Sequence, residues 1–105
     1  MSDESFALAV ERTLETVLSQ LEDCAPEVEA DLVDSVLTLE LPDASKIILN
    51  RQEAVEQLWL ACSDGPTRFQ RTEHGWQDTQ SGKGLAEVLS TLIGRRLGRA
   101  LEIRL

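Results

Sequence analysis

Two neighbouring apolar stretches set the architecture of this chain, KIILN at residues 46–50 and EQLWLAC at residues 56–62. In the second stretch, Trp59 separates Leu58 from Leu60. Side chains along a β-strand point alternately to opposite faces, so the two leucines share one face and Trp59 lies on the other. We therefore expect two adjacent strands of a sheet that is buried on one face.

Further strands are predicted on both sides of this pair. The strand pattern begins at Asp31, continues through alternating leucines at positions 37, 39 and 41, and is followed by a turn at residues 42–45. After a break at residues 64–66, two short strands are predicted at residues 67–72 and 76–79. Because the connections are short, we expect five or six strands in an antiparallel sheet.

A helix is predicted before the sheet, over residues 4–23. Its apolar residues recur at spacings of three and four, namely Phe6, Val10, Leu14, Val17, Leu18 and Leu21. Asp3 is the predicted N-cap, Glu4 suits the positive end of the helix dipole, and Pro26 ends the segment.

A second helix is predicted after Ser81-Gly82, where the helical period returns. Gly98 is its expected C-terminal cap, and Arg95 and Arg96 complement the dipole in its last turn. Taken together, the pattern predicts one α+β domain over residues 1–105. Both helices cover one face of the sheet, and the other face is left exposed.

Composition favours a folded protein of the cytoplasm. The chain has 105 residues, 42% of them hydrophobic, and no apolar run near the roughly 20 residues that a membrane span requires. Asp3 and Glu4 make its N-terminus acidic where a secretory signal would be basic. Cys24 and Cys62 have neither disulfide nor zinc spacing, so we expect free thiols in a reducing compartment.

The net charge of −9 is concentrated in the first third of the chain. Residues 1–34 contain ten acidic residues and one basic residue, Arg12, whereas residues 35–105 contain nine of each. Such a field repels phosphate backbones, so nucleic acid is not an expected partner. It attracts cations and basic protein surfaces.

Carboxylates are the candidate metal ligands, because the chain has one histidine and no His/Cys cluster of the zinc type. Residues at i and i+4 are neighbours on a helix, so Glu11 and Glu15 form one candidate pair. Glu22 and Asp23 form a second together with an acid of the following segment. The candidate ligands are Glu11, Glu15, Glu22, Asp23, Asp31 and Asp34. Oxygen ligands favour hard cations such as Fe³⁺, Ca²⁺, Mg²⁺ and Mn²⁺, and Fe²⁺ with less preference, and without a preorganised loop the binding is weak.

Conventional catalysis has little support in the sequence, and we expect a binding protein. His74 stands in a predicted turn with no nucleophile nearby in sequence, and neither cysteine has a nucleophile context. The segment Ser81–Gly84 resembles part of a phosphate loop, but the full spacing is missing, so we interpret it as the entry to the second helix.

Trp59 marks the second candidate site, on the open face of the sheet. The same alternation points Asn50, Gln52 and Arg68 outward. An exposed tryptophan surrounded by Asn, Gln and Arg has the composition of a protein-binding hot spot. The alternative, that Trp59 belongs to the core, would invert the facing of this strand.

Several motifs of the chain resemble the frataxin family, in particular its bacterial CyaY-type branch. The most specific are SKIILNRQE at residues 45–53 and QLWLA at residues 57–61. The motifs GPTRF at 65–69, Gly75-Trp76 and Ser81-Gly82 continue in register, as do the acidic first helix and VLTL at 36–39. The resemblance covers nearly the whole chain. As departures, Leu18, Ser19 and Ala25 stand where many bacterial members carry further acids.

The resemblance implies a sandwich of two helices on an antiparallel sheet and a role in iron–sulfur cluster assembly. It implies weak binding of Fe²⁺ or Fe³⁺ on an acidic ridge that includes Glu22 and Asp23. It also implies docking of a monomer on a complex of cysteine desulfurase and scaffold protein, through positions matched by Asn50, Gln52, Trp59 and Arg68. Two alternatives stay open, an iron donor or store with ferroxidase-like activity and a metal-independent adaptor. Iron-driven oligomers are compatible with each.

Overall fold

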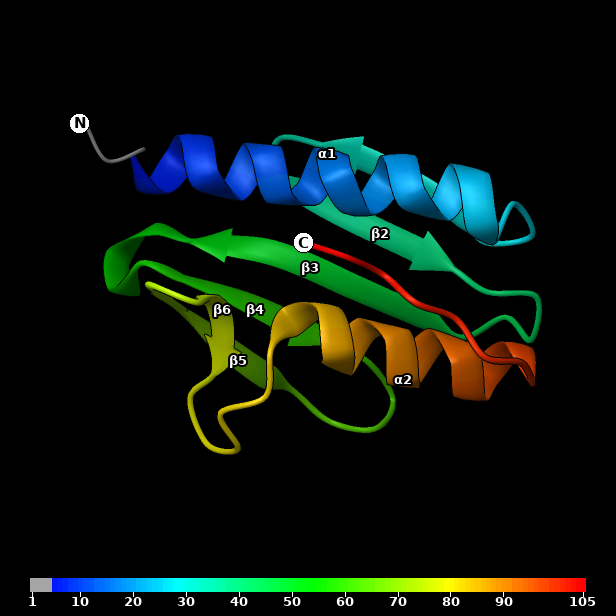
Figure 1. Ribbon diagram of the computed structural model, residues 1–105. Coiled ribbons are helices and arrows are strands. Elements are labelled where there is room, and N and C mark those ends of the chain that lie inside the picture. The colour runs from blue at the N-terminus through cyan, green and yellow to red at the C-terminus, as the bar shows by residue number, and fades with distance from the viewer. Residues whose placement is uncertain (1–4) are drawn as a thin grey trace.

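The structure, a computed structural model, describes residues 5–105 and contains two helices and a six-stranded antiparallel sheet (Figure 1). In chain order the elements are α1 (Phe6–Cys24), β1 (Glu29–Val33), β2 (Val36–Glu40), β3 (Lys46–Gln52), a 3₁₀ turn (Glu53–Val55), β4 (Gln57–Ala61), β5 (Thr67–Thr72), β6 (Gly75–Asp78) and α2 (Leu85–Leu97). The strands lie in the sheet in sequence order. The predicted α+β fold is therefore confirmed, with six strands.

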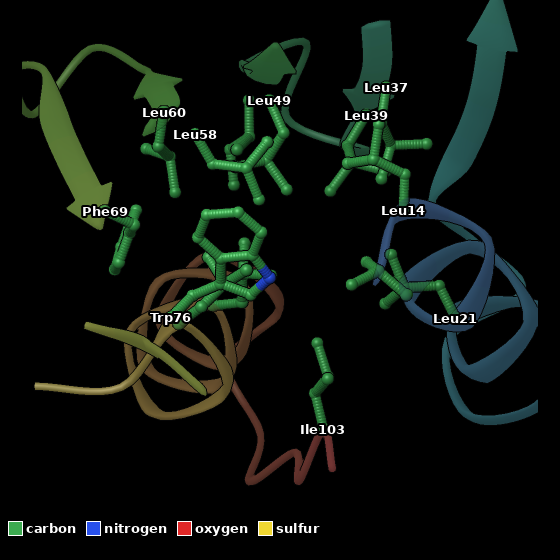
Figure 2. Close-up of a cluster of buried hydrophobic side chains, with 14 of the residues drawn as sticks. Leu14, Leu21, Leu37, Leu39, Leu49, Leu58, Leu60, Phe69, Trp76 and Ile103 are labelled. Carbon is green, nitrogen blue, oxygen red and sulfur yellow. The ribbon is translucent and has the colours of Figure 1, made fainter. Parts of the chain in front are cut away.

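Both helices pack on the same face of the sheet, and the core lies between the two layers (Figure 1). The alternating residues Leu37, Leu39, Ile47, Leu49, Leu58, Leu60 and Phe69 point from the strands into this core. Figure 2 shows Leu14 and Leu21 of α1 approaching the strand leucines from the helix layer. No helix in residues 5–105 covers the opposite face, so half of the sheet surface is open.

The sequence pattern did not separate the two strands of the first hairpin. It indicated only one change, from helical to strand periodicity, at Asp31. The structure instead has two strands, β1 and β2, joined at Asp34 and Ser35. Both residues have positive φ, 52° and 64°, as a two-residue type I′ turn requires. The usual signal for this turn is Asn-Gly or Asp-Gly, and the absence of a glycine concealed it.

The start of α1 differs from the prediction. The observed N-cap is Ser5, whose Oγ accepts a hydrogen bond from the Leu8 N–H at 3.2 Å. The helix therefore begins at Phe6, a buried residue whose ring packs edge-on against Trp76 at 6.0 Å between ring centroids. The predicted cap Asp3 and the neighbouring Glu4 lie outside the described residues. At the end of α2, Gly98 adopts the expected left-handed conformation, with φ 73°.

The C-terminal segment runs back between the two helices (Figure 1). The Ile103 N–H donates to Ser90 Oγ of α2 at 2.8 Å, and the Arg104 N–H donates to Gln20 Oε1 of α1 at 2.8 Å. Between these bonds the Ile103 side chain is buried in the helix layer (Figure 2). The segment is thus a strap that ties both helices together. Within residues 5–105, no helix is both long and apolar enough to cross a bilayer.

Candidate functional site

Trp59 lies on the open face of the sheet, as the alternation predicts. Leu58 and Leu60 are almost fully buried on the helix side, whereas the Trp59 ring is partly exposed on the other side. Strand register places Asn50 and Arg68 directly beside it, one on each neighbouring strand. Residues far apart in sequence therefore form one cross-strand row.

The Trp59 side chain is held in place by two neighbours. The Arg68 guanidinium carbon lies 4.7 Å from the centroid of the indole ring, in cation–π geometry. The indole N–H donates to Gln57 Oε1 at 2.8 Å. Both contacts fix the orientation of the ring on the open face of the sheet.

A row of amides borders this ring. Register aligns four glutamines on successive strands, Gln52, Gln57, Gln70 and Gln77. Gln52 also donates to Asn50 Oδ1 at 2.5 Å, which joins the amide row to the Trp59 row. We call Asn50, Gln52, Gln57, Trp59, Arg68 and Gln70 the Trp59 surface. Gln57 and Gln70 are not among the residues predicted for this site. Alternation places each on the outer face, but only register brings them together.

The acidic candidates of α1 occupy its outward surface. Glu15, Glu22 and Asp23 are exposed, and Glu11 is half-buried. Glu11 is already engaged, because its carboxylate accepts a hydrogen bond from the Ser35 hydroxyl in the β1–β2 turn. We call these four acids, with Asp31 and Asp34, the acidic ridge.

The two remaining acids of the ridge lie on the first hairpin. In β1, Ala30 and Leu32 pack against the core, so Asp31 points to the open face of the sheet, opposite the face that α1 covers. Asp34 is exposed in the turn. In the described part of the chain, no three His, Cys, Asp or Glu side chains gather as a metal centre. The ridge fits a hard cation held by one or two carboxylates with water in the other positions, which implies weak binding.

Glu27, a further acid of the same region, is neutralised by an arginine. Arg99 Nη2 lies 3.0 and 2.9 Å from the two Glu27 carboxylate oxygens and also donates to the Cys24 carbonyl at 3.1 Å. The hydrogen bond from Arg99 holds the pKa of Glu27 below its ordinary value. Since 72 positions separate the two residues, this pairing had no signal in the sequence.

The remaining reactive residues do not form a catalytic arrangement in residues 5–105. The His74 side chain is exposed in its turn, as expected, with Glu73 as its ion-pair neighbour at 3.7 Å. Cys24 and Cys62 are both free and half-buried. No sulfur, hydroxyl and imidazole therefore converge on one point.

The loop before α2 is a helix entry and not a phosphate loop. Asp78 fills its centre, accepting from the Gln80 N–H at 2.9 Å and the Ser81 hydroxyl at 2.8 Å. These hydrogen bonds, the one from Gln80 first, lower the pKa of Asp78 from its ordinary value. The loop thus folds around a carboxylate of the chain itself, and Gly84 then caps α2.

Comparison with known proteins supports the resemblance. A family model described as a frataxin-like domain matches residues 1–99. The iron-sulfur cluster assembly protein CyaY of Thioalkalivibrio sulfidiphilus is 36% identical over 98% of this chain and 100% of its own length. The protein of the same name from Dechloromonas aromatica is 33% identical over 99% of this chain and 100% of its own length.

Solved structures show the same fold. Frataxin from Psychromonas ingrahamii aligns over the whole of both chains with a TM-score of 0.90 at 26% identity. The trimeric frataxin of Saccharomyces cerevisiae, complexed with ferrous iron, aligns over 94% of this chain and 90% of its own, with a TM-score of 0.72 at 23% identity. That second likeness concerns the fold alone.

Proposed function

Since this chain belongs to the frataxin family, whose curated members include iron-sulfur cluster assembly proteins, we propose that it serves in iron–sulfur cluster assembly. More specifically, it acts as one domain and as a cytoplasmic monomer. It docks on the complex of cysteine desulfurase and scaffold protein, and it modulates cluster synthesis rather than catalysing a reaction of its own. Two surfaces carry this role, the Trp59 surface and the acidic ridge.

The observation that carries the proposal is the Trp59 surface. An aromatic ring stacked under an arginine and bordered by amides has no role in the core, which lies on the other face of the sheet. Tryptophan and arginine are the residues most often found as binding hot spots. Covering the ring with a partner would desolvate both side chains while the amides hydrogen-bond to partner groups.

The acidic ridge supplies orientation and a place for iron. Exposed carboxylates on α1 attract a basic surface of the partner and speed its association. The same carboxylates hold iron weakly, as cargo that a scaffold protein can remove. Because no three of the described acids gather at one point, each iron would contact few protein ligands and exchange readily.

A metal-independent adaptor is the second candidate function. The same dispersal of the acids favours it, because a surface without a metal centre works equally well as a docking surface. The two functions can be separated by measuring binding to the desulfurase–scaffold complex under anaerobic conditions, once without iron and once with Fe²⁺. Equal binding in both conditions favours the adaptor. The rate of the desulfurase or of cluster assembly can also be measured with and without this protein. If the rate responds to iron only when the protein is present, the result favours the modulator with iron as cargo.

The test of docking compares Trp59→Ala with the parent and with Leu8→Ala. Leu8 is also a large exposed apolar residue, 56% exposed, but it lies on α1 away from the sheet surface. Trp59→Ala should bind the complex roughly tenfold more weakly or worse, since interface tryptophans contribute about 2 kcal/mol or more. Its unfolding free energy should fall by no more than about 1 kcal/mol, because only the Arg68 and Gln57 contacts are lost.

Leu8→Ala should leave binding unchanged within a factor of about two. Equal binding by Trp59→Ala and the parent, measured by calorimetry on folded proteins, would refute docking through this surface.

A further inference from the structure

The first strand, β1, is an edge of the sheet, and its outer backbone groups have no partner within residues 5–105. The strand order places β2 on one side of β1 and no strand on the other. Across the two-residue turn, Val33 and Val36 form a hydrogen-bonded pair, and such pairs recur at every second residue of the ladder. The N–H and C=O groups of Ala30 and Leu32 therefore point away from β2. No other hydrogen bond of the described residues reaches them.

Acidic side chains lie on both faces of this edge. On the open face of the sheet, Glu29 and Asp31 are exposed at alternate positions of β1. On the other face α1 lies over β1, and Glu11 accepts a hydrogen bond from Ser35 in the adjoining turn. That flank of α1 carries two further acids at helical spacing, Glu15 and Glu22. Carboxylates thus border the unpaired backbone groups of β1 on both faces.

These carboxylates select the charge of a segment that pairs with the edge. Within the described residues, neither Glu29 nor Asp31 has an ion-pair partner. A second copy of the chain would bring its own Glu29 and Asp31 to the same edge, where like charges repel. A segment that carries Lys or Arg is attracted instead. The edge therefore disfavours self-pairing and favours a basic strand.

Val33 adds an apolar position to this edge. Its side chain is 55% exposed and lies on the same face as Asp31, two residues further along β1. The open face of β1 thus presents an acid, an acid and a valine, in order from Glu29 to Val33. Side chains directly opposite each other on neighbouring strands have Cβ atoms about 4.5–5.5 Å apart. A complementary strand would place two basic side chains and one apolar side chain beside these three.

We propose that β1 accepts a basic extended segment of a partner protein as an additional, antiparallel strand. The backbone of this segment bonds to the outward groups of Ala30 and Leu32. Two of its basic side chains pair with Glu29 and Asp31, and an apolar side chain covers Val33. Since β2 and β3 separate β1 from β4, the added strand leaves the docking surface around β4 free. Only the sign of the partner's charge rests on the proposed function, which does not include main-chain pairing.

The experiment adds the peptide acetyl-Thr-Val-Thr-Lys-Thr-Lys-Thr-amide to ¹⁵N-labelled protein at low ionic strength. In the antiparallel register its valine lies opposite Val33 and its lysines lie opposite Asp31 and Glu29. We expect saturable binding that slows hydrogen exchange at the amides of Ala30 and Leu32, which are unpaired in the free protein. A control peptide is N-methylated at the two threonines that precede the lysines. It keeps the charge but should bind roughly fivefold more weakly or worse, because two backbone donors are lost.

Variants of the protein test the same two features. The double variant Glu29→Gln, Asp31→Asn should weaken binding of the peptide roughly fivefold or more, because both lysines lose their partners. The matched variant Glu53→Gln, Glu73→Gln removes two exposed charges away from β1 and should stay within a factor of about two. Ala30→Pro removes one outward N–H and no bond to β2, so it should weaken binding as N-methylation does. The pair of peptides gives the answer if this variant does not fold.

Equal binding of the two peptides, without slower exchange at Ala30 and Leu32, would overturn strand addition. That result would leave the attraction of the acidic ridge for a basic partner and docking through Trp59 untouched. Absence of saturable binding would also overturn strand addition. So would exchange at these two amides that slows with protein concentration and without peptide, because a second copy would then occupy the edge.

Discussion

Gly94 is the one glycine of α2 that is buried inside the helix. A Cβ atom there would lie 2.8 Å from the Arg99 carbonyl oxygen and 3.7 Å from the Leu101 nitrogen. The chain cannot easily withdraw, because the Arg99 N–H donates to the Gly94 carbonyl at 3.1 Å and Arg99 is bound to Glu27. The missing side chain is what lets the C-terminal strap turn back against α2.

Gly94→Ala should therefore destabilise the protein, although alanine favours a helix by about 1 kcal/mol over glycine. Displacing backbone from a tightly packed contact costs about 1–3 kcal/mol, and the gain in propensity offsets only part of it. We expect a net loss of about 1 kcal/mol, measured by urea unfolding. Thr91→Ala, at an exposed position one turn earlier, should be neutral or slightly stabilising. A stabilised Gly94→Ala variant would mean that the strap moves away freely.

The two tryptophans of the chain have opposite roles at this scale. Trp76 is 7% exposed, packs edge-on against Phe6 and donates to Thr13, as a core tryptophan does. Trp59 is stacked under Arg68 on the open face. The position of Trp59 follows the prediction. The difference arises from the face that each strand residue occupies, since the ring is the same.

At the scale of elements, the acidic ridge combines a helix and an edge strand that present their acids in different directions. The α1 acids point outward from the helix layer, whereas Asp31 shares the open face of the sheet with the Trp59 surface. A partner that covers the open face would therefore meet Asp31 but not Glu15. Metal bound on α1 and partner bound on the sheet need not compete.

Metal binding should be weak and confined to α1, β1 and the turns beside them. Anaerobic titration with Fe²⁺, followed by NMR, should broaden the amides of residues 11–34, because a paramagnetic ion broadens nearby signals. The variant Glu22→Gln, Asp23→Asn, Asp31→Asn removes three charges at nearly constant shape and should reduce the broadening. The matched variant Glu53→Gln, Glu73→Gln, Glu102→Gln removes three exposed charges elsewhere and should leave it unchanged.

Broadening centred on His74 or Cys62 would contradict the carboxylate assignment. So would an equal loss of broadening in both triple variants, which would point to a general effect of net charge. A dissociation constant far below the micromolar range would contradict the dispersed geometry, because high affinity requires several preorganised ligands.

At the scale of the whole molecule, the excess negative charge stays on one part of the surface. The described acids of the first third lie exposed or half-buried on α1, on β1 and in the turns beside them. Only part of the repulsion is relieved by ion pairs, such as the one between Glu27 and Arg99. Like charges held close together in the folded state reduce stability, and the unfolded chain can separate them.

Added salt should therefore stabilise this protein. Raising NaCl from a few millimolar to about 0.15 M shortens the screening length to about 8 Å and weakens repulsion along the ridge. A gain of about 1 kcal/mol would raise the melting temperature by about 4–8 °C in a domain of this size. The triple variant that removes Glu22, Asp23 and Asp31 should melt higher at low salt and respond less to NaCl. A melting temperature independent of salt would contradict a charge-limited fold.

Local periodicity in the sequence determined the element types outside the first hairpin, most core residues and the outward facing of Trp59, because each depends on residues a few positions apart. The strand motifs were also specific enough to indicate the family. Tertiary structure alone decided which outward residues meet: Gln57 and Gln70 joined Trp59 through register, and Arg99 reached Glu27. It also placed Asp31 on the open face of the sheet and Arg71 on the helix side, opposite Trp76. Such contacts join segments far apart in sequence, and they depend on strand register and on the path of the strap between the helices.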